Sequence, residues 1–473
     1  MRLRQVWGVL WGSGAGRVGV LFLATLVLVS LYVVLTYPAD FGLSRWNNPA
    51  YWADNTKSAP PAWTGLWGGG RTRHRVWEAA RPQAVVPLQN GEARAYSFPF
   101  SLDEGEVPSL FSLTLQDALY HQGPPLLSVE LGRPDGRELT LLRYSLPGPR
   151  PGEAPPIARF QETPLRLLLS REESVLWAVS GFLQREFATS LSPAALSGGM
   201  EAALFGTPLG AGFRPLPGQY TLTVEVLAQD PRDRVGRVKV VLGGSTYGAM
   251  GTDALGRDLA SGLLFGFPIS LLIGLATALA VTTVGTFLGV VSGFSAGRTD
   301  TLIQRTCDVL VNIPLLPILI FLIFLMGQRL WLVVVILIAF GWPGLTIVVR
   351  SMVLQLRSGQ LVEALYSMGA SRWRIMFRHH LVQIAPFILA QLIFITPAAI
   401  LAEAGLSFLG LGDPSIPTWG QLLEQGFRTG AVYLGYWWWV LPPGLLIVAT
   451  AMTFMLLVLG LEPVVNPRLR SRF

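Results

Sequence analysis

Six apolar runs, each long enough to cross a lipid bilayer as a helix, constrain this chain more than any other feature. They are residues 18–36, 269–291, 309–325, 332–349, 387–408 and 436–459. Hydrophobic residues make up 51% of the chain and charged residues only 14%, which is a membrane composition. Because a backbone in lipid must satisfy its own hydrogen bonds, the sequence predicts a membrane protein that is all-α within the bilayer, with six transmembrane helices.

A long segment without any apolar run, residues 37–250, separates the first span from the other five. It is rich in proline and glycine, and short alternating runs at residues 96–102, 126–131, 138–144, 165–169, 220–226 and 236–242 read as strands. A helical patch is expected at residues 193–205. The sequence thus predicts three parts: a tail and first helix (1–36), an inserted all-β, sandwich-like domain (37–250), and a five-helix membrane core (251–473).

Arginine sets the predicted orientation, because Lys57 and Lys239 are the only lysines. Arginines precede the first run and crowd the loops expected inside, whereas the short outer loops contain only Arg329 and Arg428. The positive-inside rule therefore predicts cytoplasmic termini and an extracytoplasmic β domain. A cleaved signal peptide is the alternative for the first run, but its length and the poor cleavage site at residues 36–39 favour an uncleaved span.

Several classes of function lack support in the residues. Cys307 is the only cysteine and the four histidines have no metal-ligand spacing, so neither a disulfide nor a metal site is expected. The basic residues are scattered, which argues against nucleic-acid binding. No catalytic arrangement occurs in the spans, and neither lysine follows a glycine-rich turn, so the chain cannot supply a P-loop for ATP.

A charged helix-break-helix loop, residues 358–386, stands between two apolar runs and suits a contact with another protein. Glu363 and Ala364 open a helix, Gly369 breaks it, and Arg374 and Arg378 follow. This pattern resembles the EAA loop of bacterial ABC importer permeases. The resemblance implies that Glu363, Ala364, Gly369, Ala370, Arg374 and Arg378 couple the chain to a cytoplasmic ATPase. A bulky residue at Gly369 is expected to jam the break.

Further motifs resemble the C-type permease subunit of dipeptide, oligopeptide and nickel importers. The string Gly251-Thr252-Asp253-Ala254-Leu255-Gly256-Arg257-Asp258 precedes the second span, and residues 406–412, 417–420 and 466–470 also match. The resemblance implies a MetI-like fold in a bacterial or archaeal cell membrane. It also implies a B-type permease partner, two ATPases that bind ATP and Mg²⁺, and an extracytoplasmic solute-binding protein; this chain itself would hold no cofactor.

Polar residues within the spans are candidates for the translocation path, because such groups in lipid usually face a partner or a cavity. They are Asp308, Asn312 and Glu403. Helix-to-helix bonding is the simpler explanation for Asp308 and Asn312, and pairing with a neighbouring subunit is the alternative for Glu403. Di- or oligopeptides are the leading solutes, with oligosaccharides or nickel as alternatives. A membrane-anchored binding or sensory protein is the rival function. The sequence departs from the family pattern at Val382, where proline is usual, and in the size of the β domain.

Overall fold

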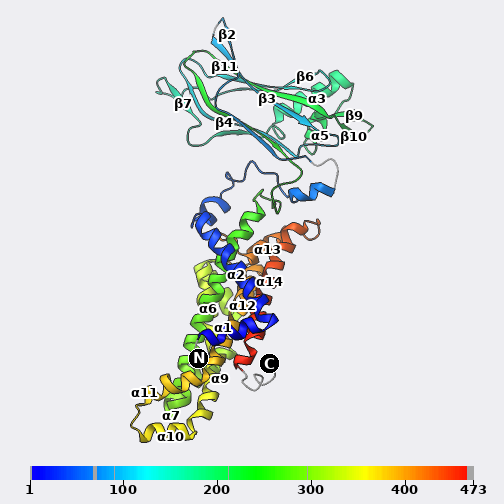
Figure 1. Cartoon of the computed structure of the whole chain (residues 1–473). Coiled ribbons are helices and arrows are strands. Elements are labelled where there is room, and N and C mark those ends of the chain that lie inside the picture. Colours follow the sequence, from blue (N-terminus) through cyan, green and yellow to red (C-terminus); the bar gives the residue numbers. More distant parts are fainter. Residues whose placement is uncertain (1–2, 68–71, 90, 211, 296, 466–473) are drawn as a thin grey trace. The chain divides into compact units, whose positions relative to one another are not determined.

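A computed structural model describes residues 3–67, 72–89, 91–210, 212–295 and 297–465 of the chain. These residues form two compact units, which are drawn in Figure 1. The helical unit combines Met1–Asn48 with Ala260–Phe473. The second unit is Pro49–Leu259, which we call the outer unit after the position that the sequence predicts for it. Both boundaries fall later than residues 37 and 251, where the hydropathy changes.

The helical unit is built from thirteen segments within its described residues. They are α1 (Leu3–Gly12), α2 (Gly14–Thr36), η1 (Gly42–Trp46), α6 (Leu259–Ser295), α7 (Gly297–Asn312), α8 (Leu315–Met326), α9 (Leu330–Arg357), α10 (Gln360–Ser367), α11 (Arg372–Arg374), η3 (Ile375–His380), α12 (Leu381–Phe408), α13 (Trp419–Arg428) and α14 (Trp437–Val465). In Figure 1, α10 and α11 lie at one end of this unit and α13 lies towards the other end.

Five helices within the described residues are long and apolar enough to cross a membrane, and a sixth span results if the bent pair α7 and α8 counts as one. The expected third span, residues 309–325, is therefore not a single straight helix. The helices α7 and α8, which share this run, meet at 80° across Ile313 and Pro314. Proline disfavours helical angles at the residue before it and cannot donate a backbone hydrogen bond, which accounts for the break.

Small residues let the long helices approach closely. A Cβ atom added at Gly289 of α6 would lie 2.8 Å from the backbone oxygen of Thr346 on α9, and one at Gly293 would lie 2.8 Å from that of Arg350. At the α2–α14 contact, a Cβ on Gly460 would lie 2.6 Å from the Cα of Gly16. Helix association in lipid depends on such close packing, because lipid tails are as apolar as leucine.

The outer unit contains two five-stranded antiparallel sheets and a short hairpin. One sheet has the order β1-β12-β4-β7 with β8 also on β4, the other has the order β2-β3-β11-β5-β6, and β9 pairs with β10. The strands are β1 (Arg75–Ala79), β2 (Ala84–Leu88), β3 (Gly91–Leu102), β4 (Leu110–Tyr120), β5 (Leu126–Gly132), β6 (Glu138–Ser145), β7 (Ile157–Arg159), β8 (Leu165–Leu167), β9 (Gly206–Leu209), β10 (Gly212–Pro215), β11 (Gly218–Ala228) and β12 (Arg234–Gly243). The unit also has the helices η2 (Ala62–Trp67), α3 (Glu173–Phe187), α4 (Pro193–Leu196) and α5 (Met200–Leu204).

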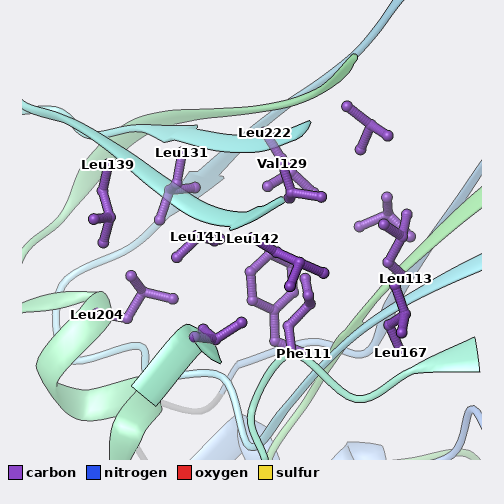
Figure 2. Packing of buried hydrophobic residues seen from close by; sticks show 14 of the residues in the cluster. Phe111, Leu113, Val129, Leu131, Leu139, Leu141, Leu142, Leu167, Leu204 and Leu222 are labelled. Atoms are coloured by element: carbon purple, nitrogen blue, oxygen red, sulfur yellow. The ribbon is translucent and has the colours of Figure 1, made fainter. Parts of the chain in front are cut away.

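Both five-stranded sheets contribute to a single hydrophobic core. Figure 2 shows Val129 and Leu131 of β5 and Leu222 of β11 with Phe111 and Leu113 of β4 around the same interior space. Each of these side chains is fully buried. Burying a leucine, valine or phenylalanine contributes about 1.5–3 kcal/mol relative to leaving it exposed, so this core is the main source of the unit's stability.

Strand β4 and helix α3 were missed from the sequence, although both carry a periodic signal. In β4, buried Phe111, Leu113 and Leu115 alternate along the strand, but Asp117 is exposed and has a positive φ, and the alternation ends there. In α3, the buried residues Val175, Leu176, Val179, Phe182 and Leu183 follow a helical period. The expected strands at residues 96–102, 126–131, 138–144, 220–226 and 236–242 lie within β3, β5, β6, β11 and β12.

Candidate functional site

The EAA loop (residues 358–386) breaks at Gly369, as its sequence predicts. Gly369 has a φ of +75°, and the Ala370 N–H donates to the Leu365 carbonyl over 3.0 Å. This bond closes the end of α10 in the manner that a left-handed residue at the helix end permits. A Cβ atom at Gly369 would meet no described atom within 4 Å, so the backbone conformation, and not a lack of space, requires glycine here.

The helix restarts at Ser371, which the sequence analysis did not single out. The Ser371 hydroxyl accepts from the Arg374 N–H over 3.4 Å, and the Ile375 N–H donates to the Ser371 carbonyl over 3.1 Å. A serine directly before a new helix is a common cap, so this signal was available. The chain then passes through one π-helical segment, η3, before it continues as α12. Such π-turns are rare and occur often at functional sites.

The loop has a buried face and an exposed face. Val362, Leu365, Ile375 and Met376 are buried in a cluster with side chains of α6 and α9, including Val290. The exposed face contains Glu363, Ala364, Ser367, Met368, Gly369, Ser371, Arg372, Trp373, Arg374 and Arg378. Five of the six residues implied by the family resemblance lie on the exposed face, and Ala370 is half-buried. The loop is thus fixed to its own unit by one side while the other side is open to a partner.

Three stacked aromatic rings connect the loop to α6. The Trp373 and Phe377 rings are 5.3 Å apart with planes 13° from parallel, and the Phe377 and Phe287 rings are 5.6 Å apart at 19°. Trp373 is 62% exposed, so one end of the stack lies on the open face of the loop. This connection has no local signal in the sequence, because Phe287 lies far from the loop in the chain.

An ion pair between α7 and α9 lies in the same helical unit. Both oxygens of Asp300 bind Arg350, with Nε–Oδ1 and NH2–Oδ2 distances of 2.6 Å, and the Ser292 hydroxyl of α6 donates to Asp300 Oδ1 over 2.5 Å. Bidentate pairs of this kind fix geometry well. The pair therefore joins three helices near the point where α9 leads into the EAA loop. In the sequence, Arg350 is one of the arginines in the loops expected inside, and no local pattern marks it as a partner of Asp300.

The motif Gly251–Asp258 lies in the outer unit, where it closes on residues 55–59. The Thr252 hydroxyl donates to the Thr56 carbonyl over 2.6 Å and accepts from the Ala59 N–H over 2.9 Å. The Asp253 carboxylate accepts from the Leu255 and Arg257 N–H groups over 2.8 Å and also binds the Arg257 side chain.

Two glycines, a hydrogen bond from Asn55 and a β-bridge complete this arrangement. Gly251 and Gly256 have φ values of +71° and +82°, and the Asn55 side chain donates to the Gly256 carbonyl over 2.9 Å. Asp258 lies at the end of the motif, where Thr252 and Asp258 form an isolated β-bridge. We call residues 55–59 and 251–258 the clasp. It joins the segment that enters the outer unit to the segment that leaves it.

Comparison with known proteins decides the family. The family described as "Binding-protein-dependent transport system inner membrane component" matches residues 285–471. The dipeptide transport system permease protein DppC of Bacillus subtilis (strain 168) is 37% identical over 221 residues, which cover 46% of this chain and 68% of that relative. This chain belongs to the same permease family.

Other relatives agree with this assignment. The oligopeptide transport system permease protein OppC of Haemophilus influenzae is 34% identical over 47% of this chain and 71% of its own length. The glutathione transport system permease protein GsiD of Pectobacterium atrosepticum is 36% identical over 47% of this chain and 73% of its own length. The chain is thus a C-type ABC importer permease, a multi-pass inner membrane transporter subunit and not itself an enzyme.

Glu403 of this permease is buried at a corner between α12 and α13. Its Oε1 accepts from the Ser407 hydroxyl over 2.7 Å and from the Thr418 hydroxyl over 2.9 Å. Thr418 also caps α13, because its hydroxyl accepts from the Gln421 N–H over 3.3 Å. Next to it, the Trp419 ring N–H donates to the Leu263 carbonyl of α6 over 3.0 Å. The motifs at residues 406–412 and 417–420 therefore build this corner.

Asp308 and Asn312 lie one turn apart on α7 and are both exposed in the isolated permease. The Asn312 amide donates to the Asp308 carbonyl over 2.7 Å, and the Asp308 carboxylate lies 3.7 Å from Arg305. Within the described residues, neither forms a hydrogen bond or an ion pair with Glu403. The structure thus places Asp308 and Asn312 next to each other on α7, whereas Glu403 lies apart from them between α12 and α13.

Two other sequence observations need a position. Val382 lies early in α12 and is 59% exposed, and the motif at residues 466–470 lies outside the described residues.

Among the described residues, His121, Asp230 and Asp233 bring possible metal-ligand atoms within 4.8 Å of one another. Arg232 already binds Asp230, lowering the pKa of that carboxyl, while Asp233 accepts from the His121 N–H over 2.8 Å. The carboxylates of Asp230 and Asp233 therefore already have partners within the protein.

Proposed function

We propose that this permease forms half of the translocation path of an ATP-driven importer for di- and oligopeptides, with a B-type permease as the other half. The observation that carries the proposal is the EAA loop, whose apolar side is buried in the permease while its polar side is exposed. A loop held in this way can move as a rigid body with a partner bound to its open face. The printed functions of the relatives, dipeptide, oligopeptide and glutathione transport, favour peptide solutes.

The partners follow from this role. Two cytoplasmic ATPases bind ATP and Mg²⁺ and contact the loop around Glu363, Ala364, Gly369, Ala370, Arg374 and Arg378. When the ATPases close, the loop moves and the helices switch from inward-facing to outward-facing. An extracytoplasmic solute-binding protein then delivers the solute. The permease itself holds no cofactor in this scheme.

The topology completes the proposal. We infer six spans, with the bent pair α7 and α8 counted as one, and cytoplasmic termini. The outer unit is an extracytoplasmic β-sandwich inserted between the first and second spans. Asp308 and Asn312 are better candidates for the path than Glu403, because their side chains are exposed whereas Glu403 is buried and accepts hydrogen bonds from Ser407 and Thr418.

Purification of the tagged permease from its native membrane in mild detergent tests the assembly. Recovery of two P-loop ATPases and a second permease is expected, and recovery of the chain alone, under conditions that preserve other membrane complexes, contradicts the proposal. The purified complex is then reconstituted in proteoliposomes with its binding protein. Uptake of labelled di- and oligopeptides is expected. Uptake of an oligosaccharide or nickel instead would support the importer assignment but contradict peptides as the solutes.

A further inference from the structure

A cavity in the outer unit has no role in the transport scheme. It has a volume of about 530 Å³ and lies between β3, β4 and β12. Its wall includes Arg81, Arg94, Tyr96, Asp117, Gln161 and Arg234. Pockets that hold small ligands commonly have volumes of about 300–1,000 Å³, with apolar walls and a few convergent polar groups. The size of this cavity agrees with that description, and its wall is more polar, because six of its twelve residues are polar or charged.

The backbone is strained at this cavity. Four described residues other than glycine have a positive φ, and two of them, Asp117 (+56°) and Phe160 (+61°), are bonded to each other here. The Asp117 N–H donates to the Phe160 carbonyl over 3.1 Å. Next to Asp117 on the paired strand β12 stands Gly236, where a Cβ atom would lie 2.8 Å from the Asp117 Cβ. Strained residues persist only where the surroundings hold them, and they cluster at ligand sites.

The charged groups of the cavity differ in how they are held. Arg94 is fixed, because it binds Glu92 over 3.0 Å and donates to the Pro231 carbonyl over 2.6 Å. The side chains of Arg81, Arg234 and Asp117, in contrast, have no hydrogen bond or ion pair within the described part of the chain. The cavity thus offers two unpaired guanidinium groups and one unpaired carboxylate in a frame that Arg94 and the buried Tyr96 keep rigid.

We propose that this cavity binds a small zwitterionic solute, one molecule with both a carboxylate and an ammonium group, such as a short peptide. Arg81 and Arg234 bind the carboxylate, for which guanidinium groups have the matching planar geometry. Asp117 binds the ammonium group, and its left-handed backbone turns its side chain out of the strand alternation. This binding site does not depend on the transport role of the helical unit.

Calorimetric titration of the purified full chain, in detergent and without its binding protein, tests the site. The probe is trialanine, and its controls are trialanine amide, which lacks the carboxylate, and N-acetyl-trialanine, which lacks the ammonium group. We expect trialanine to bind and each blocked peptide to bind about tenfold more weakly or worse, as expected for the loss of a charge-assisted contact.

Variants locate the binding to this cavity. Arg81→Gln with Arg234→Gln, and separately Asp117→Asn, should each weaken trialanine binding about tenfold or more. Asparagine tolerates the left-handed conformation, so Asp117→Asn removes the charge and keeps the backbone. Arg143→Gln is the matched control, since Arg143 is an exposed arginine on β6 outside the cavity.

Three results would overturn the proposal: no trialanine binding to the wild type, equal binding of the blocked peptides, or unchanged binding in the cavity variants. Inorganic phosphate is the second probe. Phosphate binding without trialanine binding would identify an anion site and reject the zwitterion assignment. Because the blocked peptides are tested on the wild-type chain, the proposal stays testable even if a variant does not fold.

Discussion

At the scale of single residues, the structure changes the reason why Gly369 matters. A bulky side chain was expected to jam the break, but the space around the Cβ position is open within the described residues. What remains is the positive φ, which costs a residue other than glycine roughly 1–2 kcal/mol. The limit on substitution at Gly369 is therefore conformational.

We expect Gly369→Ala to reduce stimulation of ATP hydrolysis by the binding protein in the reconstituted complex, and Gly369→Asn to reduce it less, because asparagine adopts positive φ more readily. Gly405→Ala is the control, since Gly405 also has open space but lies within α12 without a positive φ. Equal effects of alanine and asparagine at Gly369 would contradict the conformational explanation.

Glu403 provides a second test. Glu403→Ala leaves the Ser407 and Thr418 hydroxyls without their buried acceptor, at a cost of about 1–3 kcal/mol for each unsatisfied group. Glu403→Gln keeps an acceptor oxygen. We expect the alanine variant to lower the thermal unfolding midpoint of the detergent-purified permease and the glutamine variant to transport normally. Loss of transport in a well-folded glutamine variant would instead place the carboxylate in the path.

Ionisation of Glu153 makes the stability of the outer unit depend on pH. Hydrogen bonds from the Arg159 side chain, and then from the Arg150 N–H, lower the pKa of Glu153 from its ordinary 4.5 to about 2. A carboxyl with a lowered pKa stabilises the folded state above its unfolded pKa, and this contribution is lost as pH falls from 4.5 towards 2. Glu153→Gln should therefore lower the unfolding midpoint at neutral pH but not at pH about 2. Glu138→Gln, at an exposed residue, is the control; the same shift at both pH values would refute the linkage.

At the scale of elements, the stacked rings of Trp373, Phe377 and Phe287 connect the open face of the EAA loop with α6. Aromatic pairs contribute about 0.5–1.5 kcal/mol beyond their buried area. We therefore expect the stack to help transmit movement of the loop to α6.

Phe377→Leu keeps an apolar side chain and removes the stack. We expect the variant to assemble with the ATPases and hydrolyse ATP, but to transport less solute for each ATP hydrolysed. Phe394→Leu is the matched control, because Phe394 lies in α12 and is partly exposed without a stacking partner among the described rings. A normal ratio of transport to hydrolysis in Phe377→Leu would show that the stack is not a coupling element.

At the scale of the whole molecule, the clasp defines where the outer unit can be removed. The Ala62 N–H donates to the Gly248 carbonyl and the Tyr247 N–H donates to the Pro60 carbonyl, over 2.8 and 2.9 Å. The entering and leaving segments are therefore bonded to each other before the sheets begin. A deletion that starts near residue 51 would also remove the Asn55, Thr56 and Ala59 side of the clasp.

Replacement of residues 66–244 by a short glycine-serine linker should leave a chain that still inserts and assembles with its partners, because the clasp bonds remain. Its reconstituted complex is compared with the wild type for ATP hydrolysis stimulated by the binding protein. If the solute-binding protein docks on the outer unit, stimulation of ATP hydrolysis is expected to fall. If the outer unit is only a spacer, stimulation is expected to be normal. Failure to assemble would show that the clasp does not hold without the sheets.

The sequence by itself determined the family, the five long apolar helices and the position of the EAA loop, because those features depend on local patterns: apolar length, a helix-breaking glycine and short motifs. It also identified five of the longer strands in the outer unit. Tertiary structure alone decided the shared core of the two sheets, the Asp300–Arg350 pair, the aromatic stack, the burial of Glu403 and the strained cavity around Asp117. Apart from Glu403, whose hydrogen-bond partners lie within 15 residues of it, each of these joins residues that are distant in the chain, and only the folded backbone determines which distant side chains meet.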